Sequence, residues 1–264
     1  MRCGISMRQQ RSLATLVAIL ISSVACGPLP RGADSQAQNV FGSDDRQEIT
    51  TDQYPWRAIG KLSVGCTGTL VGRDLVLTAA HCVIDRSTKA LRADVGSFLP
   101  NFKNGAAATS SAITHVWWGT NDPDKYRSSD WAVLRLKAAL GDQYGWLGIQ
   151  PTNVDTFPAG LTVVGYSTDF RSGQTAGVHH NCSVHNRLAA NGLVAHDCDA
   201  SRGSSGGPVL RMYNNQLMVY GVHVSENRDG GPESLRLPGY DGTHPNFAIP
   251  SQGFLAQVKA AGVH

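Results

Sequence analysis

Ser205 has the surroundings of a reactive serine. It lies in the string GSSGGP at residues 203–208. Flanking glycines permit a tight turn that exposes a serine hydroxyl and directs backbone N–H groups toward a developing oxyanion. A Gly/Ser-rich loop without chemistry has the same composition, so this string by itself does not define a nucleophile.

Two other residues could supply what a nucleophilic serine needs. His81 closes the apolar run LTAAHC, which places it at the end of a strand. A nearby histidine is the usual base that makes a serine hydroxyl nucleophilic at neutral pH. Asp130 precedes the run WAVLRL and can hold the histidine in the required tautomer. The rival acids Asp122 and Asp124 lie in NDPD, which is typical of an exposed turn.

The elements that must position these residues are mostly strands. From about residue 40 the chain is a series of short runs rich in Val, Leu or Thr and bounded by turn residues. These runs are residues 57–64, 66–71, 75–79, 131–136, 161–166, 207–212 and 217–224. They predict an all-β protein of two small barrels with a site between them. Residues 250–262 predict a short C-terminal helix that is capped near Ser251 and buries Phe254 and Val258.

Length and composition limit the class of protein. The chain has 264 residues, of which 41% are hydrophobic and 16% charged, so a disordered chain is excluded. The formal net charge is +3, but residues 1–37 hold four of the 23 basic residues and one of the 20 acidic ones. The remainder is therefore neutral. This gives no support to nucleic-acid binding, which requires a clustered basic surface.

The N-terminus has the pattern of an export signal. Residues 1–11 carry three arginines and no acid, and residues 12–25 are nearly all apolar or small. A helix of this length would rise about 21 Å, which is short of a bilayer core of about 30 Å. No other stretch could span a membrane. We expect a signal peptide at 1–25, a propeptide or linker at 26–38 and one domain at 39–264, in a protein secreted to the extracellular space or the periplasm.

Two cleavage sites compete near this signal. Small residues precede Cys26, and the same position loosely resembles a bacterial lipoprotein box in which Cys26 would carry a lipid anchor. A later site near residues 35–37 would remove a propeptide. We therefore expect a zymogen that is latent until the segment 26–38 has been removed.

The cysteine count fits an exported protein. The six cysteines are Cys3, Cys26, Cys66, Cys82, Cys182 and Cys198. Cys3 is lost with the signal, and removal or lipidation of Cys26 leaves an even number, which indicates two disulfides in an oxidising compartment. Four cysteines allow three pairings, and the spacing does not choose among them.

A metal site is the alternative for one cysteine. It would be formed by His179, His180, Cys182 and His185. Their spacing fits no zinc signature well, so a disulfide is the simpler interpretation outside the cell.

Together and in this order, LTAAHC, SSDWAVLRL and GSSGGP resemble the trypsin/chymotrypsin superfamily of serine endopeptidases. The resemblance covers about residues 39–262 and implies two packed six-stranded antiparallel β-barrels with a short C-terminal helix. It implies that His81 is the general base and then the general acid. It implies that Asp130 orients this histidine and that Ser205 attacks the scissile carbonyl.

The same resemblance implies further features of the site. The backbone amides of Gly203 and Ser205 would form the oxyanion hole. The disulfides would join Cys66 to Cys82 and Cys182 to Cys198. Protein or peptide substrates are expected, without a cofactor or a catalytic metal.

Other strings point to one branch of the superfamily. Animal trypsins carry Asp immediately before the nucleophile, where this chain has Ser204, so the trypsin mode of activation is not implied. The strings NVFGSDDR, HDCD, GVH and NFAI, at residues 39–46, 196–199, 221–223 and 246–249, resemble the bacterial glutamyl endopeptidases. A bacterial source is therefore expected.

The primary specificity pocket allows two interpretations. Asp199, six residues before the nucleophile, would select Arg or Lys if it formed the pocket floor. His223 would contact an acidic side chain, as its counterpart does in glutamyl endopeptidases. The Thr that helps this contact is replaced by Ala200, and the far wall would continue through Ser225 to Glu226. Cleavage after Glu or Asp is favoured over cleavage after Arg or Lys.

A protein without catalysis is the alternative function. Some relatives with this architecture are catalytically silent and act as binding modules at the cell surface. Such relatives usually lose a triad position or the glycine turn, and this sequence keeps all of them.

Overall fold

The structure is a computed structural model that describes residues 39–152, 158–188, 192–226, 236–237, 240–241 and 244–262. The predicted signal peptide and propeptide, together with Cys26, lie outside these residues. None of the helices in the described ranges is long and apolar enough to cross a membrane.

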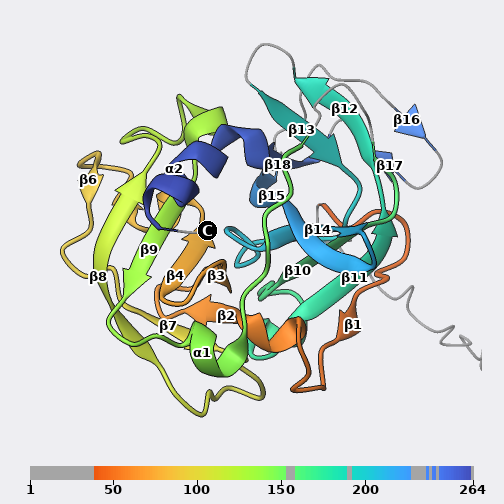
Figure 1. Cartoon of the computed structure of the whole chain (residues 1–264). Coiled ribbons are helices and arrows are strands. Elements are labelled where there is room, and N and C mark those ends of the chain that lie inside the picture. Colours follow the sequence, from red (N-terminus) through yellow and green to blue (C-terminus); the bar gives the residue numbers. More distant parts are fainter. Residues whose placement is uncertain are drawn as a thin grey trace, which may run out of the picture. The chain divides into compact units, whose positions relative to one another are not determined.

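Six strands close into an antiparallel barrel (Figure 1). They are β2 (Ile59–Leu62), β3 (Thr67–Leu70), β4 (Leu75–Thr78), β7 (Ser97–Pro100), β8 (Ser111–Trp118) and β9 (Ala132–Leu136). The order around the barrel is β2-β3-β4-β9-β8-β7. Side chains such as Leu62, Leu70, Phe98 and Leu134 fill its interior and are fully buried.

Eight strands form a second antiparallel sheet beside the barrel (Figure 1). They are β1 (Gln47–Glu48), β10 (Leu161–Gly165), β11 (Gly177–Cys182), β12 (Val184–Leu188), β13 (Leu193–His196), β14 (Pro208–Tyr213), β15 (Gln216–Glu226) and β18 (Asn246–Pro250). The order is β1-β11-β10-β14-β15-β18-β13-β12. The expected double-barrel fold is confirmed. Its second half is a sheet whose two end strands, β1 and β12, are not paired with each other in the part that the structure describes, so this half does not close there.

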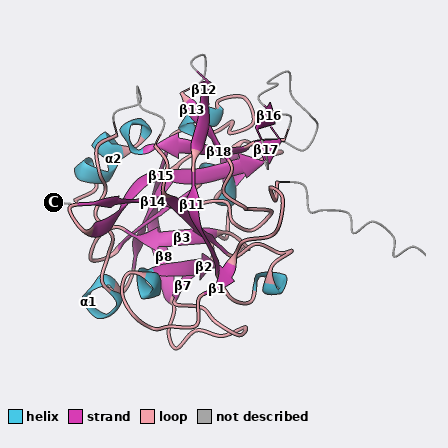
Figure 2. Cartoon of the chain, turned by 90° about the vertical axis from the view of Figure 1, so that its right-hand side faces the viewer, coloured by secondary structure: helices cyan, strands magenta, loops and turns pink. Residues whose placement is uncertain are grey.

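Short elements connect these strands, as Figure 2 shows. They are β5 (Ile84–Asp85), β6 (Ala90–Leu91), β16 (Arg236–Leu237), β17 (Tyr240–Asp241), α1 (Gly141–Tyr144), α2 (Leu255–Ala260), and the 3-10 helices η1 (Trp56–Ala58), η2 (Ala80–Cys82), η3 (Arg127–Ser129), η4 (Arg171–Gly173) and η5 (Ser251–Gly253).

The C-terminal helix is confirmed with a different start. Phe254 and Val258 are buried as expected, and Leu255 is only half-buried. Ser251 does not cap the helix. Its hydroxyl donates a 2.5 Å hydrogen bond to the carbonyl of Gln150, and the chain makes a 3-10 turn before α2 begins.

The barrel and the second sheet share one hydrophobic core. Leu77 and Val133 from the barrel belong to the same buried cluster as Val222 and Phe247 from the sheet. The two halves are also hydrogen-bonded across Thr67 of β3, whose backbone amide and side chain both bond to residues of the second half. Ser205, whose carbonyl accepts the amide of Thr67, lies at this contact between the barrel and the second sheet.

Candidate active site

Strand pairing brings His81 and Asp130 together. Strands β4 and β9 are antiparallel neighbours, with Thr78 opposite Ala132. His81 follows the end of β4 and Asp130 precedes the start of β9, so both residues emerge at the same end of this strand pair. These two residues, 49 positions apart in the sequence, are thus neighbours in the fold.

The contact between these two residues fixes the imidazole. One oxygen of Asp130 accepts the backbone N–H of His81 at 2.8 Å, and the other lies 2.7 Å from Nδ1. Asp130 is 5% exposed. Because a carboxylate only accepts hydrogen bonds, the neutral imidazole carries its proton on Nδ1 and keeps a lone pair on Nε2. This is the tautomer that a general base for a hydroxyl requires.

Ser205 lies in the loop between β13 and β14. Gly203 and Gly206 flank the turn with φ of +102° and +83°, a left-handed region that favours glycine. A Cβ on Gly203 would overlap the carbonyl oxygen of Tyr166. The turn that carries the half-buried Ser205 therefore requires glycine at positions 203 and 206.

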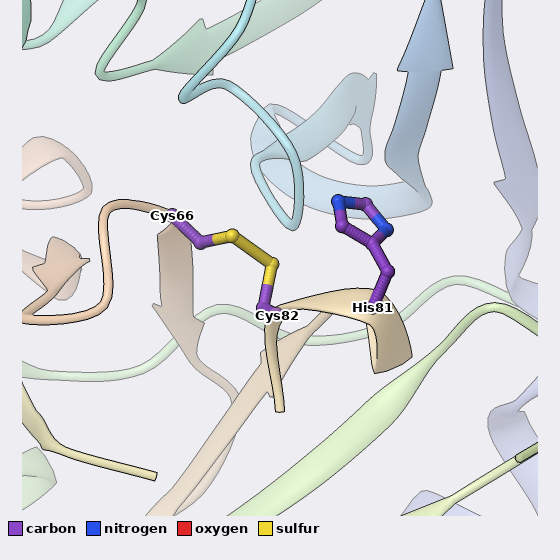
Figure 3. Close-up of side chains that lie close together, drawn as sticks. All are labelled: Cys66, His81 and Cys82. Carbon is purple, nitrogen blue, oxygen red and sulfur yellow. A yellow bond between two sulfur atoms is a disulfide. The ribbon is translucent and has the colours of Figure 1, made fainter. Parts of the chain in front are cut away.

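The barrel holds this turn beside His81. The carbonyl of Ser205 accepts a 2.9 Å hydrogen bond from the amide of Thr67 and lies 3.9 Å from Sγ of Cys82, the residue after His81. Figure 3 shows the imidazole and the disulfide of Cys82 rising from one short turn, with a pale blue loop between them. The sequence-predicted base and nucleophile thus come from adjacent loops.

The amides predicted to form an oxyanion hole are available. No acceptor among the described residues takes a hydrogen bond from the backbone N–H of Gly203 or Ser205. The neighbouring amides of Ser204, Gly206 and Gly207 all donate within the protein. The turn therefore offers two donors at the place where an oxyanion would form.

Both implied disulfides are present. Cys66 is bonded to Cys82 behind His81, and Cys182 is bonded to Cys198. The first ties the turn of His81 to the start of β3. The second ties the end of β11 to the segment that leads to Ser205.

The proposed metal ligands do not converge in the described part of the chain. Two groups of closely spaced ligand atoms occur there, Cys66 with His81 and Cys82, and Asp197 with Cys182 and Cys198. Every cysteine in these two groups is disulfide-bonded. Such sulfurs offer no thiolate. His185 instead lies 2.6 Å from a carboxylate oxygen of Asp197.

Asp199 is buried and bonded to the segment that begins at Asn39. It is 2% exposed, one oxygen accepts the amide of Phe41 at 2.9 Å, and the other accepts the amide of Asp45 at 3.0 Å. The ring of His179 lies 3.2 Å from the same carboxylate. Nδ1 of this ring accepts the backbone amide of Asp199 at 2.8 Å, so His179 also holds the backbone of this residue. This geometry does not support Asp199 as a floor that selects Arg or Lys.

The next residue, Ala200, is bonded to the same segment, which begins at Asn39. Ala200 is fully buried, and its amide donates to the carbonyl of Asn39 at 3.3 Å. The side-chain amide of Asn246 donates to the carbonyls of Asn39 and Cys198 at 3.0 and 2.7 Å. Asp199 and Ala200 therefore fix the start of the domain against the sheet.

His223 lies beside the nucleophile turn. Its backbone is bonded to that turn twice, since its carbonyl accepts the amide of Gly206 at 2.7 Å and its amide donates to Gly207 at 2.9 Å. Its ring is fully buried and its Nδ1 lies 3.3 Å from Nε2 of His196. Burial, and then the charge of neighbouring histidines, hold the pKa of His196 well below its ordinary value, so His196 is neutral.

Residues 223–226, which were predicted to form the far wall of the pocket, make two contacts that the sequence did not indicate. Nε2 of His223 lies 3.7 Å from a carboxylate oxygen of Glu226. The hydroxyl of Ser225 accepts a 2.6 Å hydrogen bond from Arg127, whose guanidinium packs 4.7 Å from the ring centre of Phe247. His196 stood in a recognised string, but nothing in the sequence linked Arg127 to this wall.

The closed barrel, the second sheet and the bonded His81 and Asp130 beside a serine turn are the arrangement of the trypsin-type fold. A profile of the family described as Trypsin matches residues 44–252, and the chain belongs to this family. The stated resemblance to the superfamily is confirmed.

Particular relatives come from different kinds of organism. Serine protease 23 of Mus musculus is 34% identical over 78% of this chain and 64% of that protein. Glutamyl endopeptidase of Bacillus licheniformis is 28% identical over 73% of this chain and 61% of that protein. The chain thus spans less than two thirds of the length of these relatives. Relatives from mammals and from Bacillus both match, so the expected bacterial source stays a prediction.

A solved structure agrees with the fold. The structure of a Glu endopeptidase in complex with MPD aligns with a TM-score of 0.68 and 24% identity, covering 85% of this chain and 100% of that one. At this identity the likeness concerns the fold.

Proposed function

We propose that this chain is an active serine endopeptidase with His81, Asp130 and Ser205 as its catalytic triad. The observation that carries the proposal is the double hydrogen bond from His81 to the buried Asp130, next to the turn of Ser205. This pair holds the imidazole in the tautomer that can accept a proton at Nε2.

The reaction would follow from this arrangement. Nε2 of His81 takes the proton of the Ser205 hydroxyl while Oγ attacks the scissile carbonyl, and Asp130 stabilises the resulting imidazolium. The amides of Gly203 and Ser205 bind the oxyanion. His81 then protonates the leaving amine. In the second half of the reaction His81 takes a proton from water as the water attacks the acyl-enzyme, and it returns this proton to Oγ of Ser205 as the ester bond breaks. Removing Ser205 should lower kcat by about 10⁴-fold or more.

We infer a preference for acidic substrate residues from the hydrogen bonds of two histidines. Nδ1 of His196 accepts the amide of Cys198 at 3.2 Å, so neutral His196 carries its proton on Nε2. That N–H points to Nδ1 of His223, which makes Nδ1 the acceptor and leaves the proton of His223 on Nε2. No described residue accepts a hydrogen bond from this buried N–H. A substrate carboxylate would supply the acceptor.

The test is cleavage of a peptide library by the purified protein, with Ser205→Ala as the control. Cleavage after Glu or Asp by the parent only is the expected result. Cleavage after Arg or Lys would reject the acidic preference while retaining the triad. Labelling of Ser205 by a phosphonofluoridate probe checks the nucleophile directly, and an unlabelled, folded protein would reject the triad.

A silent binding module is the second candidate function. The specific observation in its favour is a relative named Inactive serine protease 35 of Rattus norvegicus, 28% identical over 66% of this chain. The phosphonofluoridate experiment separates the two candidates, because a silent module would take no label on Ser205.

We also propose that the protein is exported and processed. The two disulfides support an oxidising compartment. Mass spectrometry of the mature N-terminus tests the processing. A start near Asn39 without lipid would reject a lipid anchor at Cys26, and full activity in a chain that begins at Cys26 would reject latency.

A further inference from the structure

The turn that carries Ser205 is built on the segment that follows β10. The amide of Thr168 donates a 2.8 Å hydrogen bond to the carbonyl of Arg202. In a trans peptide the C=O and the N–H point in opposite directions, so this bond directs the N–H of Gly203 away from Thr168. The carbonyl of Ser204 accepts the amide of Gly207 at 2.8 Å, which sets the N–H of Ser205 in the same way.

Two buried hydroxyls support the same turn. Ser167 and Ser204 are each 1% exposed, and their hydroxyls are hydrogen-bonded to each other. The Ser167 oxygen also accepts the amide of Ser201 at 3.3 Å. One side chain therefore holds both ends of the segment 201–204. The group that the turn contributes to this contact, the hydroxyl of Ser204, carries no charge.

A charged anchor reaches the turn from outside it. The hydroxyl of Ser201 donates to a carboxylate oxygen of Asp169. The same carboxylate accepts two hydrogen bonds from Arg46, at 2.9 and 3.0 Å. The Arg46 side chain is 3% exposed, and its other bonds go to Asp44 at 2.7 and 2.8 Å.

We propose that Asp169, held by Arg46, is a positioning residue that fixes the oxyanion hole through Ser201. Planar, paired hydrogen bonds between a guanidinium and a carboxylate hold the Asp169 oxygens in one orientation. The fixed carboxylate accepts the hydroxyl of Ser201 in one orientation. Ser201 in turn holds the peptide groups of Gly203 and Ser205 so that their N–H groups point into the oxyanion hole. This role rests on the proposed function, since it acts on the hole used by Ser205.

Such a role affects the transition state more than the substrate. Loss of one oxyanion donor costs about 10² to 10³ in kcat, and a loosened donor costs a part of that. We expect Asp169→Asn and Ser201→Ala to lower kcat by about 10-fold or more, with KM changed less than about threefold. The rate is expressed per active site, counted by the final extent of phosphonofluoridate labelling, so that misfolded molecules do not enter it.

A second readout distinguishes positioning from general weakening. A peptide aldehyde forms a tetrahedral adduct whose oxyanion uses the hole, whereas the product peptide on the leaving-group side, which begins with the released amine, does not. We expect the aldehyde to bind the variants about 10-fold more weakly, with unchanged binding of the product peptide. Arg46→Met should give the same loss, and its combination with Asp169→Asn should lose no more than either single variant.

Asp44→Asn is the matched control. Asp44 bonds to the same Arg46, but its side chain is 43% exposed and, among the described residues, makes no hydrogen bond to the turn. Asp44→Asn should keep kcat within about threefold, because Arg46 retains Asp169 as a partner. If Asp169→Asn does not fold, Ser201→Ala leaves the Arg46 and Asp169 pair intact and decides the question.

The outcomes are separable. Folded Asp169→Asn and Ser201→Ala that keep the parent kcat per labelled site would overturn the positioning role alone. A fall in kcat with unchanged aldehyde affinity would also overturn it. A parent protein that takes no label and cleaves nothing would overturn the proposed function and this role together.

Discussion

The carboxylate of Asp199 accepts the backbone amide of Phe41 at 2.9 Å, across 158 positions of sequence. Together with the bond from Asp45, this contact uses both oxygens of a fully buried acid to hold the start of the domain. A residue six positions before the nucleophile thus has a structural partner in the place where a substrate cation was expected.

Asp199→Asn should therefore change stability and leave specificity unaltered. The amide side chain retains one acceptor but presents an N–H₂ to one of the two backbone donors. We expect a loss of about 1–3 kcal/mol in the free energy of unfolding. Thermal denaturation and the peptide library measure the two properties on one sample. A variant that loses cleavage after Arg or Lys, with stability intact, would return Asp199 to the pocket.

His223→Ala should remove the acidic preference. The buried N–H on Nε2 is the donor that a substrate carboxylate would meet, and a hydrogen bond to a charged group contributes about 1.5–3 kcal/mol. The ratio of kcat/KM for Glu over Gln peptides should therefore fall about 10- to 100-fold. His196→Gln is the companion variant, since it changes the group that sets the proton position on His223. An unchanged ratio in both variants would contradict this interpretation.

Glu226→Gln should strengthen the acidic preference. A carboxylate 3.7 Å from Nε2 of His223 competes with a substrate carboxylate for the same donor, and like charges close together disfavour each other. We expect kcat/KM for Glu peptides to rise about threefold to 10-fold, with Gln peptides little changed. A fall in cleavage after Glu would show that Glu226 supports substrate binding. A loss of cleavage after Arg or Lys would show that it selects cations.

The Arg46 cluster should make stability depend on acid. Hydrogen bonds from Arg46 hold the pKa of Asp44 below 3.8, and at Asp169 those bonds outweigh a burial that raises its pKa. A depressed carboxyl pKa contributes stability that is present above the unfolded value and is lost as pH falls through the folded one. The parent should lose stability below about pH 4, and Arg46→Met should lose less over the same range. Urea unfolding at several pH values measures both slopes, and parallel slopes would contradict the expectation.

The sequence predicted those strands that are indicated by a short apolar run of their own residues. The runs at 66–71, 75–79, 131–136 and 161–166 coincide with β3, β4, β9 and β10, because short apolar runs between turn residues are typical of buried strands. Strand β8 was not predicted. Its residues, SAITHVWW, do not alternate between buried and exposed, so its place depends on its partners β7 and β9.

The same distinction holds for the site. His81, Asp130 and Ser205 were recognisable because each lies in a short string of turn and strand residues. Arg46 and Asp169 are 123 positions apart, and neither lies in a string that indicates the other. An ion pair between distant segments, here a buried Arg46 and a partly exposed Asp169, is created by the packing of the chain, and local sequence patterns do not predict it.

Ser204→Asp tests whether the turn has room for the acid that animal trypsins carry there. Ser204 is 1% exposed, packs against the Cα of Gly165, and contacts only neutral groups in the hydrogen bonds described. An ionised carboxylate buried without a partner costs about 3–5 kcal/mol. We expect Ser204→Asp to unfold at a much lower temperature than the parent, whereas Ser204→Ala should lose only about 1 kcal/mol. If Ser204→Asp were as stable as the parent, the buried carboxyl would have to be either protonated or paired with a cation, which would contradict the expected cost.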